Sequence, residues 1–329
     1  MGQTFEHEVI IVGAGPAGMC AAMYAARAML DAVVLERGLP GGELLNTELI
    51  EDYPGFEHIL GHELAQKFHD HAMKFGAVVK TGITVTSLRK RDDGMFECVT
   101  DGGDTYVAPT AIITAGGTPV KLGVPGEVEY AGKGVSYCAI CDGAFFRNHT
   151  IAVVGGGDAA AEEADFLTRY ANKVYLIHRR DELRASKILQ RRALENPKIE
   201  PIWNTVVERV EADGDGLVAR LKLRDVTSNE TRDLSVTGMF VFIGFRPNTG
   251  IIEGHVDHDA MGYLVTDENM QTSIHGLFAA GDVRAQLTRQ VTTAVGDATT
   301  AAIAAEKYLK ALRDGETEPR IVGTGGYTA

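Results

Sequence analysis

Cys138 and Cys141 are the residues of this sequence best suited to chemistry. Two thiols at this spacing can close a small disulfide ring, which a thiolate can open again. The same spacing forms half of many zinc sites, but there is no second such pair, and Cys20 and Cys98 stand alone in the sequence. A redox-active disulfide without a metal is the favoured interpretation. Asp142 follows the pair and could exchange protons with a leaving thiolate, although an aspartate before glycine most often marks a turn.

A glycine-rich turn near the N-terminus has the spacing of a dinucleotide-binding loop. It follows an apolar run at 9–12 and precedes an alanine-rich helical segment and a second apolar run at 32–35. The first glycine permits a tight turn, the second lets a pyrophosphate approach the backbone, and the third lets the helix pack closely. One such match alone also occurs as an ordinary turn in α/β proteins. The residues expected to bind the first nucleotide are Gly13, Gly15, Pro16, Ala17, Gly18 and Glu36.

A second copy of this pattern begins at Gly155, and the offset of 142 residues from Gly13 also relates Gly18 to Ala160. Apolar runs at 151–154 and 173–177 flank it, as strands should. Two copies at one offset are much less expected by chance than one, and the repeat predicts two nucleotide-binding units. In the second loop the expected binding residues are Gly155, Gly157, Asp158 and Ala160.

The residues that end the second strand of each unit differ in charge. Glu36, moved by the same offset, falls on His178, which is followed by arginines. An acid there accepts hydrogen bonds from free ribose hydroxyls, whereas arginines complement a 2′-phosphate. A solvated helix face is the alternative interpretation of the arginines. The first site is therefore expected to bind FAD or NAD and the second NADPH, the latter through His178, Arg179, Arg180 and Arg184.

These units predict an α/β fold with two Rossmann-like nucleotide-binding domains. Each is expected to have three layers (ββα), because alternating segments at 78–101 and 202–226 are interpreted as small antiparallel sheets. Glycine- and proline-rich stretches mark two domain crossings, after which a strand ending at Asp282 and a helix at 293–309 rejoin the first domain. The crossings lie at 116–126 and 244–248. The expected domains are 1–117 (FAD, first part), 118–246 (NADPH, with the cysteine pair) and 247–329 (FAD, second part).

Composition narrows the function classes. The 329 residues include 32 Lys and Arg against 45 Asp and Glu, for a net charge of −13, which argues against a nucleic-acid partner or an anionic membrane surface. No apolar run has the length of a membrane span, and no export signal is visible, so a cytoplasmic protein is expected. Cys20 and Cys98 fall in apolar patterns typical of inert core residues.

The order of these motifs resembles the bacterial and archaeal, low-molecular-weight thioredoxin reductases over nearly the whole chain. The resemblance implies a homodimer in which electrons pass from NADPH through FAD and the cysteine pair to thioredoxin or a thioredoxin-like protein. It also implies a rotation of the central domain about the two crossings. Two alternative functions are consistent with these motifs. One is a reductase or dithiol oxidase with another substrate, and the other is a nucleotide-binding redox sensor without turnover.

The resemblance also assigns individual residues. It implies that Cys141 faces the flavin, while Cys138 attacks the disulfide of the partner. Glu43 stands where relatives usually carry glutamine, and Phe245 where they often carry histidine. The further residues expected around the flavin are Gly41, Gly42, Asn46, Gly281, Asp282, Arg289, Gln290 and Val291.

Overall fold

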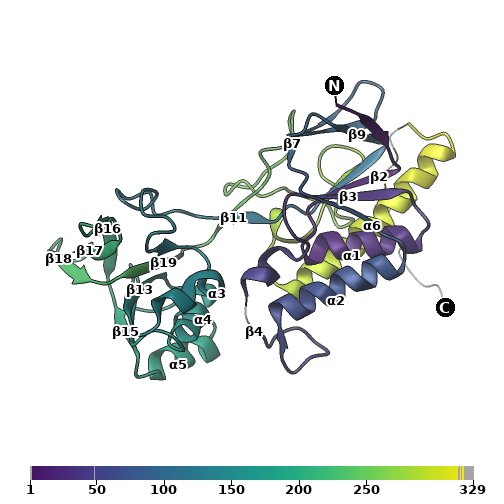
Figure 1. The fold of residues 1–329 in the computed structure, drawn as a ribbon. Coiled ribbons are helices and arrows are strands. Elements are labelled where there is room, and N and C mark those ends of the chain that lie inside the picture. Colours follow the sequence, from purple (N-terminus) through teal and green to yellow (C-terminus); the bar gives the residue numbers. More distant parts are fainter. Residues whose placement is uncertain (1, 48, 318, 320, 322–329) are drawn as a thin grey trace. The chain divides into compact units, whose positions relative to one another are not determined.

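The computed structural model describes residues 2–47, 49–317, 319 and 321. The chain divides into two compact units (Figure 1). Unit 1 combines the segment up to Thr118 with the segment from Arg246 onward, and unit 2 runs from Pro119 to Phe245. Both ends of the chain therefore build one unit, and the cysteine pair lies in the other.

Unit 1 is built on a five-stranded parallel sheet in the order β21-β10-β2-β3-β6. Strand β2 is buried along its whole length because both faces of the sheet are covered: Val9 and Ile11 pack on one side, Ile10 and Val12 on the other. The strands are β2 (Val9–Val12), β3 (Ala32–Glu36), β6 (Val78–Thr81), β10 (Thr110–Ile113) and β21 (Leu277–Ala279).

Helices cover one face of this sheet and a second sheet covers the other. Alanines give α1 a close contact with α6 in the helical layer, and Phe96 and Tyr106 fill the space between the two sheets. The helices are α1 (Pro16–Arg27), α2 (Gly61–Lys74) and α6 (Val291–Arg313), and the second sheet has the order β1-β9-β8-β7. Its strands are β1 (Thr4–Glu6), β7 (Val85–Lys90), β8 (Phe96–Thr100) and β9 (Thr105–Ala108).

One expectation for unit 1 is wrong. Residues 78–81 were expected in the antiparallel sheet, but β6 pairs in parallel with β3. β6 is the edge strand of the sheet and none of its residues is buried, with Val78 at 44% exposed, so it lacks the buried apolar run of an inner parallel strand such as β2. Only the later part of the 78–101 segment, β7 and β8, is antiparallel.

Unit 2 repeats the three-layer plan. Its parallel sheet has the order β12-β19-β13-β14-β15, with Ile151 and Val153 packed toward the helices and Ala152 and Val154 toward an antiparallel sheet, β16-β17-β18. The strands are β12 (Val135–Ser136), β13 (Thr150–Gly155), β14 (Lys173–Ile177), β15 (Ile199–Ile202), β16 (Thr205–Ala212), β17 (Val218–Asp225), β18 (Thr231–Ser235) and β19 (Gly238–Phe242). The helices are α3 (Ala139–Asp142), α4 (Asp158–Leu167) and α5 (Lys187–Glu195).

Two short paired strands, β11 (Gly117–Pro119) and β20 (Phe245–Pro247), form the connection between the units. The amide of Val120 donates to the carbonyl of Gly244 at 2.9 Å. The Asn248 side chain accepts from the Thr118 hydroxyl at 2.7 Å and donates to the Ala115 carbonyl at 2.8 Å. The start of the first crossing is thus hydrogen-bonded to the second crossing.

Across the described part of the chain, no helix has the length and apolarity needed to span a membrane.

Candidate active site

Cys138 and Cys141 are joined in a disulfide at the start of α3. Cys138 is the residue before the helix, and its sulfur accepts a hydrogen bond from the Cys141 amide at 3.2 Å. Ala139 between them is fully buried against the helical core of unit 2, which turns Cys141 to the exposed side. Cys138 is half-buried. The sulfur pair is therefore held on the surface of unit 2 by a buried neighbour.

The segment after the disulfide carries an acid and an exposed aromatic ring. Asp142 is half-buried, and its amide donates to the Cys138 carbonyl at 3.2 Å. In the short 3-10 helix η2 (Gly143–Phe146), Phe146 packs edge-on against Phe240, with ring centroids 5.2 Å apart. Phe145 points outward and is 78% exposed. An exposed aromatic side chain thus follows the disulfide by four positions in the chain.

The first glycine loop is shaped by close backbone packing at two of its three glycines. A Cβ at Gly13, whose φ is +102°, would lie 2.6 Å from the Thr114 carbonyl oxygen, and one at Gly18 would lie 1.9 Å from that of Gly13. A Cβ at Gly15 would meet nothing nearer than Gly42, at 3.8 Å. The turn and the helix packing need the outer glycines, while the space beside the middle one is open for a ligand.

Glu36 lies at this loop, as its position after β3 predicts. One carboxylate oxygen accepts from the Ala14 amide at 2.7 Å, and the other accepts from the Gly38 amide at 2.7 Å. Pro16 is the first residue of α1, so Ala17 and Gly18 form its first turn. The acid and the helix N-terminus are thus brought together at the carboxyl edge of the sheet, where a dinucleotide binds in such folds.

The second glycine pair, Gly41 and Gly42, lies against the same loop. The Gly41 amide donates to the Ala14 carbonyl at 2.8 Å, and both glycines have positive φ, +139° and +55°. In the following 3-10 helix η1 (Gly42–Asn46), the side-chain amide of Asn46 donates to the Glu43 carboxylate at 3.2 Å. Burial raises the pKa of Glu43, the Asn46 hydrogen bond opposes this, and the negative charge of Asp282 adds to it.

The C-terminal segment adds Gly281 and Asp282 to this group. A Cβ at Gly281, in the short 3-10 helix η3 (Gly281–Val283), would lie 3.0 Å from the Cβ of Ala17. Burial raises the pKa of Asp282, while Arg289 lowers it. Arg289 itself lies over the Tyr263 ring, 3.8 Å from its centroid. Gln290 caps α6, and Val291 is the first residue of that helix.

In unit 2 the second glycine loop leads into α4. A Cβ at Gly155 would lie 2.2 Å from the Phe242 carbonyl oxygen, whereas one at Gly157 would meet nothing within 4 Å. Asp158 accepts from the Ser186 amide at 2.6 Å, and the Arg184 amide donates to the Gly156 carbonyl at 2.6 Å. The arginine segment is thereby fastened to the glycine loop.

The residues after β14 separate into one buried and three exposed side chains. Arg179, Arg180 and Arg184 are exposed, but His178 is only 5% exposed. Its ring occupies the place that a side chain at Gly156 would need, with ring atoms from 2.2 Å of that Cβ position. Burial lowers the pKa of His178, and the three arginines lower it further. The neutral imidazole thus supports the loop from within, and the guanidinium groups are the ones open to a phosphate.

A cavity of about 210 Å³ lies beside this loop in unit 2. It includes Gly157, Asp158 and Arg184, but also residues that the sequence did not indicate as binding residues. Tyr137 follows β12, and the residues from Val241 to Phe245 end β19 or follow it, so the order of the strands in the sheet brings them to the loop. The residues of the cavity not predicted to bind are Pro119, Tyr137, Ala159, Val241, Phe242, Ile243, Gly244 and Phe245, with Ala160 completing the lining.

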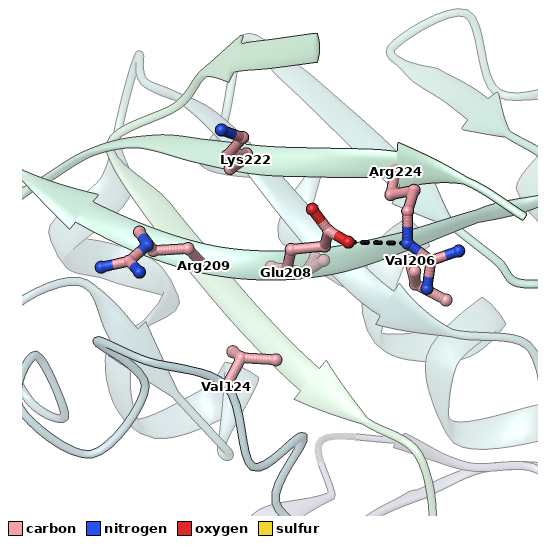
Figure 2. Close-up of a pocket in the computed structure, with 7 residues that line it drawn as sticks. Val124, Val206, Glu208, Arg209, Lys222 and Arg224 are labelled. Atoms are coloured by element: carbon pink, nitrogen blue, oxygen red, sulfur yellow. Dashed lines mark hydrogen bonds and ion pairs between the residues drawn. The ribbon is translucent and has the colours of Figure 1, made fainter. Parts of the chain in front are cut away.

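A larger cavity, about 480 Å³, lies on the antiparallel sheet of unit 2 and contains none of the predicted site residues (Figure 2). Arg224 in it donates to Glu208 at 2.6 Å, and Arg209 lies directly opposite Lys222 across the two strands. Among the described residues, no group of three or more His, Cys, Asp or Glu is placed to hold a metal ion.

The chain is similar in sequence to known reductases. It matches the pyridine nucleotide-disulphide oxidoreductase family over residues 7–298. It is 47% identical to a thioredoxin reductase of Listeria innocua, over 94% of this chain and 95% of that protein. It is 45% identical to a thioredoxin reductase of Bacillus subtilis, over 94% and 96% of the two chains.

The chain is also similar to solved structures of thioredoxin reductases. The crystal structure of Lactococcus lactis thioredoxin reductase has a TM-score of 0.89 at 42% identity, and that of T. acidophilum thioredoxin reductase has 0.87 at 36%. Each match covers 93% of this chain and 99% of the other. The chain therefore belongs to the pyridine nucleotide-disulphide oxidoreductases, and within them to the low-molecular-weight thioredoxin reductases.

Proposed function

We propose that this protein transfers electrons from NADPH, through FAD and the Cys138–Cys141 disulfide, to oxidised thioredoxin or a thioredoxin-like protein. The observation that carries the proposal is the surface disulfide in the same unit as the arginine-flanked glycine loop. Family membership supports the use of both cofactors.

The residues of unit 1 fit FAD. The open space beside Gly15 admits a pyrophosphate at the start of α1, and Glu36 presents a carboxylate to ribose hydroxyls. Gly41, Gly42 and Asp282 lie around the same loop. When bound, FAD supplies the two-electron carrier between the nicotinamide and the disulfide. The chain binds and orients it.

The residues of unit 2 fit NADPH. Gly157 leaves open the space that a pyrophosphate needs, and Arg179, Arg180 and Arg184 are exposed for a 2′-phosphate. His178 acts as a support of the loop in this proposal rather than as a phosphate ligand, because its ring is buried against Gly156.

The cysteine pair carries the exchange with the partner. The thiolate of Cys138 attacks one sulfur of the partner disulfide, which forms a mixed disulfide and releases one partner thiolate. The thiolate of Cys141 then attacks the Cys138 sulfur, which releases the second partner thiolate and restores the Cys138–Cys141 disulfide. The partner gains two electrons and two protons. We assign Asp142 to the proton movements, because it lies directly after the pair.

The exposed Phe145 supports a protein as the partner. An aromatic ring that is 78% exposed and follows Cys141 by four residues offers apolar area that a protein surface can cover. Family resemblance further supports a homodimer working in the cytoplasm, where Cys20 and Cys98 stay free thiols. Analytical sedimentation of the purified protein would measure directly whether it is a dimer.

Reduction of a panel of thioredoxin-like proteins tests this function. Purified protein with FAD should oxidise NADPH continuously in the presence of at least one oxidised thioredoxin, with two thiols formed per NADPH. A protein that binds both nucleotides but turns over with none of them would be a redox sensor. Steady turnover only in the direction of disulfide formation would make it a dithiol oxidase.

A further inference from the structure

The strand order of unit 2 gives the two halves of a bound dinucleotide different neighbours. All five strands of the sheet are parallel, so their carboxyl ends share one edge, where nucleotides bind. The glycine loop follows the central strand β13. The arginine segment follows β14 on one side of it, whereas β19 and then β12 lie on the other side. If the 2′-phosphoadenosine half lies toward the arginines, the nicotinamide half extends toward β19 and β12.

Tyr137 is the residue that follows β12 at this edge. It lines the same cavity of about 210 Å³ as Gly157, together with Phe242 and Phe245 from the end of β19 and just beyond. A half-buried tyrosine therefore forms part of the wall on the side away from the arginines. Its chain neighbour is Cys138, whose amide donates to the Ser136 hydroxyl at 3.1 Å, so the backbone on both sides of the tyrosine is fixed.

The Tyr137 hydroxyl is fixed as well. It donates to the carboxylate of Glu127 at 2.9 Å. Glu127 is completely buried and also accepts from the amides of Leu122 and Gly123, at 2.8 and 2.7 Å. Burial, the hydrogen bond and the charge of Glu127 all raise the pKa of Tyr137, which keeps its proton and remains the donor. A ring held at both ends loses little conformational freedom when a ligand packs against it.

We propose that Tyr137 forms the wall against which the nicotinamide half of NADP(H) binds, and that Glu127 is the positioning residue that holds its ring there. The inference rests on the proposed NADPH site in unit 2 and extends it to a contact on the other side of the glycine loop. The arginines select the 2′-phosphate, and Tyr137 contributes affinity only for a ligand that has the nicotinamide half.

Two ligands separate this role from a general structural one. NADP⁺ has both halves, whereas 2′,5′-ADP has only the phosphorylated adenosine half. In titration calorimetry of the full-length oxidised protein, Tyr137→Ala should weaken NADP⁺ binding about two- to tenfold, the range for one aromatic contact. Binding of 2′,5′-ADP should stay within about twofold of wild type.

Two conservative variants and one control sharpen the test. Glu127→Gln keeps the shape of the side chain, but its NH₂ group then faces hydrogen-bond donors, namely backbone amides or the Tyr137 hydroxyl. Tyr137→Phe keeps the ring but removes the hydroxyl that binds Glu127. Both should weaken NADP⁺ binding by less than Tyr137→Ala and should again spare 2′,5′-ADP. Tyr175→Ala removes a half-buried ring of β14 that lies outside the cavity, and it should affect neither ligand.

The outcomes separate cleanly. Unchanged NADP⁺ affinity in folded Tyr137→Ala, or an equal loss for both ligands, would overturn the role of Tyr137. If Tyr137→Ala does not fold, the affinities of Tyr137→Phe and Glu127→Gln for NADP⁺ and 2′,5′-ADP are compared instead. An equal loss of affinity for both ligands in these variants again overturns the role of Tyr137. Wild-type protein that binds neither ligand would instead refute the NADPH site itself, which is part of the proposed function.

Discussion

Replacement of Glu36 by glutamine tests how the first nucleotide is held. The carboxylate accepts from the Ala14 and Gly38 amides, each at 2.7 Å. Glutamine keeps one acceptor oxygen but turns its NH₂ group toward the other amide, so one charge-assisted hydrogen bond is lost. Such a bond contributes about 1.5 to 3 kcal/mol, and the half-exposed position of Glu36 favours the lower end. The charge that faces the ribose hydroxyls is lost too.

Hydrogen bonds from the ribose hydroxyls to this charged carboxylate would each contribute about 1.5 to 3 kcal/mol, so we expect Glu36→Gln to bind FAD at least about tenfold more weakly, since about 1.4 kcal/mol corresponds to a factor of ten. The lost bond to the backbone amide should instead lower the stability of the apoprotein. Quenching of flavin fluorescence during titration of apoprotein measures the affinity, and urea unfolding of the apoprotein measures the stability separately. Glu306→Gln, an exposed acid on α6, is the matched control and should change neither. Folded Glu36→Gln with wild-type FAD affinity would refute this account of the first loop.

Three further predictions follow from the second unit and the cysteines. The Arg179→Ala, Arg180→Ala double variant should lose at least about tenfold in kcat/KM for NADPH and change little with NADH; equal wild-type efficiencies with both would contradict the 2′-phosphate assignment. Cys141→Ser should give a mixed disulfide with thioredoxin through Cys138, whereas Cys138→Ser should not; trapping only in Cys138→Ser would reverse the two roles. Burial raises the pKa of Cys98 to about 12, so at pH 8 it should resist alkylation in the native reduced protein, and mass spectrometry should find label there only after unfolding.

The local pattern of the sequence was sufficient for much of the fold. The burial of both faces of β2 follows from four consecutive apolar residues, and the glycines at 13 and 18 follow from the backbone packing that they permit. The edge strand β6 was placed in the wrong sheet, because an edge strand of a parallel sheet and a half-exposed antiparallel strand both lack a fully buried apolar run. Burial pattern alone does not distinguish these two cases.

The rest of the site depends on which strands are neighbours. Tyr137 and Glu127 are unremarkable in the sequence, and nothing local reveals that β12 lies beside β19. The burial of His178 was equally hidden, because it depends on the absence of a side chain at Gly156, on another loop. Long-range contacts of this kind need the three-dimensional arrangement of the strands.

Counting the electrons that the protein accepts tests most directly whether Cys138 and Cys141 relay electrons from the flavin. In an anaerobic titration with NADPH and a regenerating system, the FAD-loaded wild type should take up about four electrons per chain, two in the flavin and two in the disulfide. The double variant Cys138→Ser, Cys141→Ser should take up about two. Equal uptake by the two proteins would contradict the account, since the disulfide would then receive no electrons from the flavin.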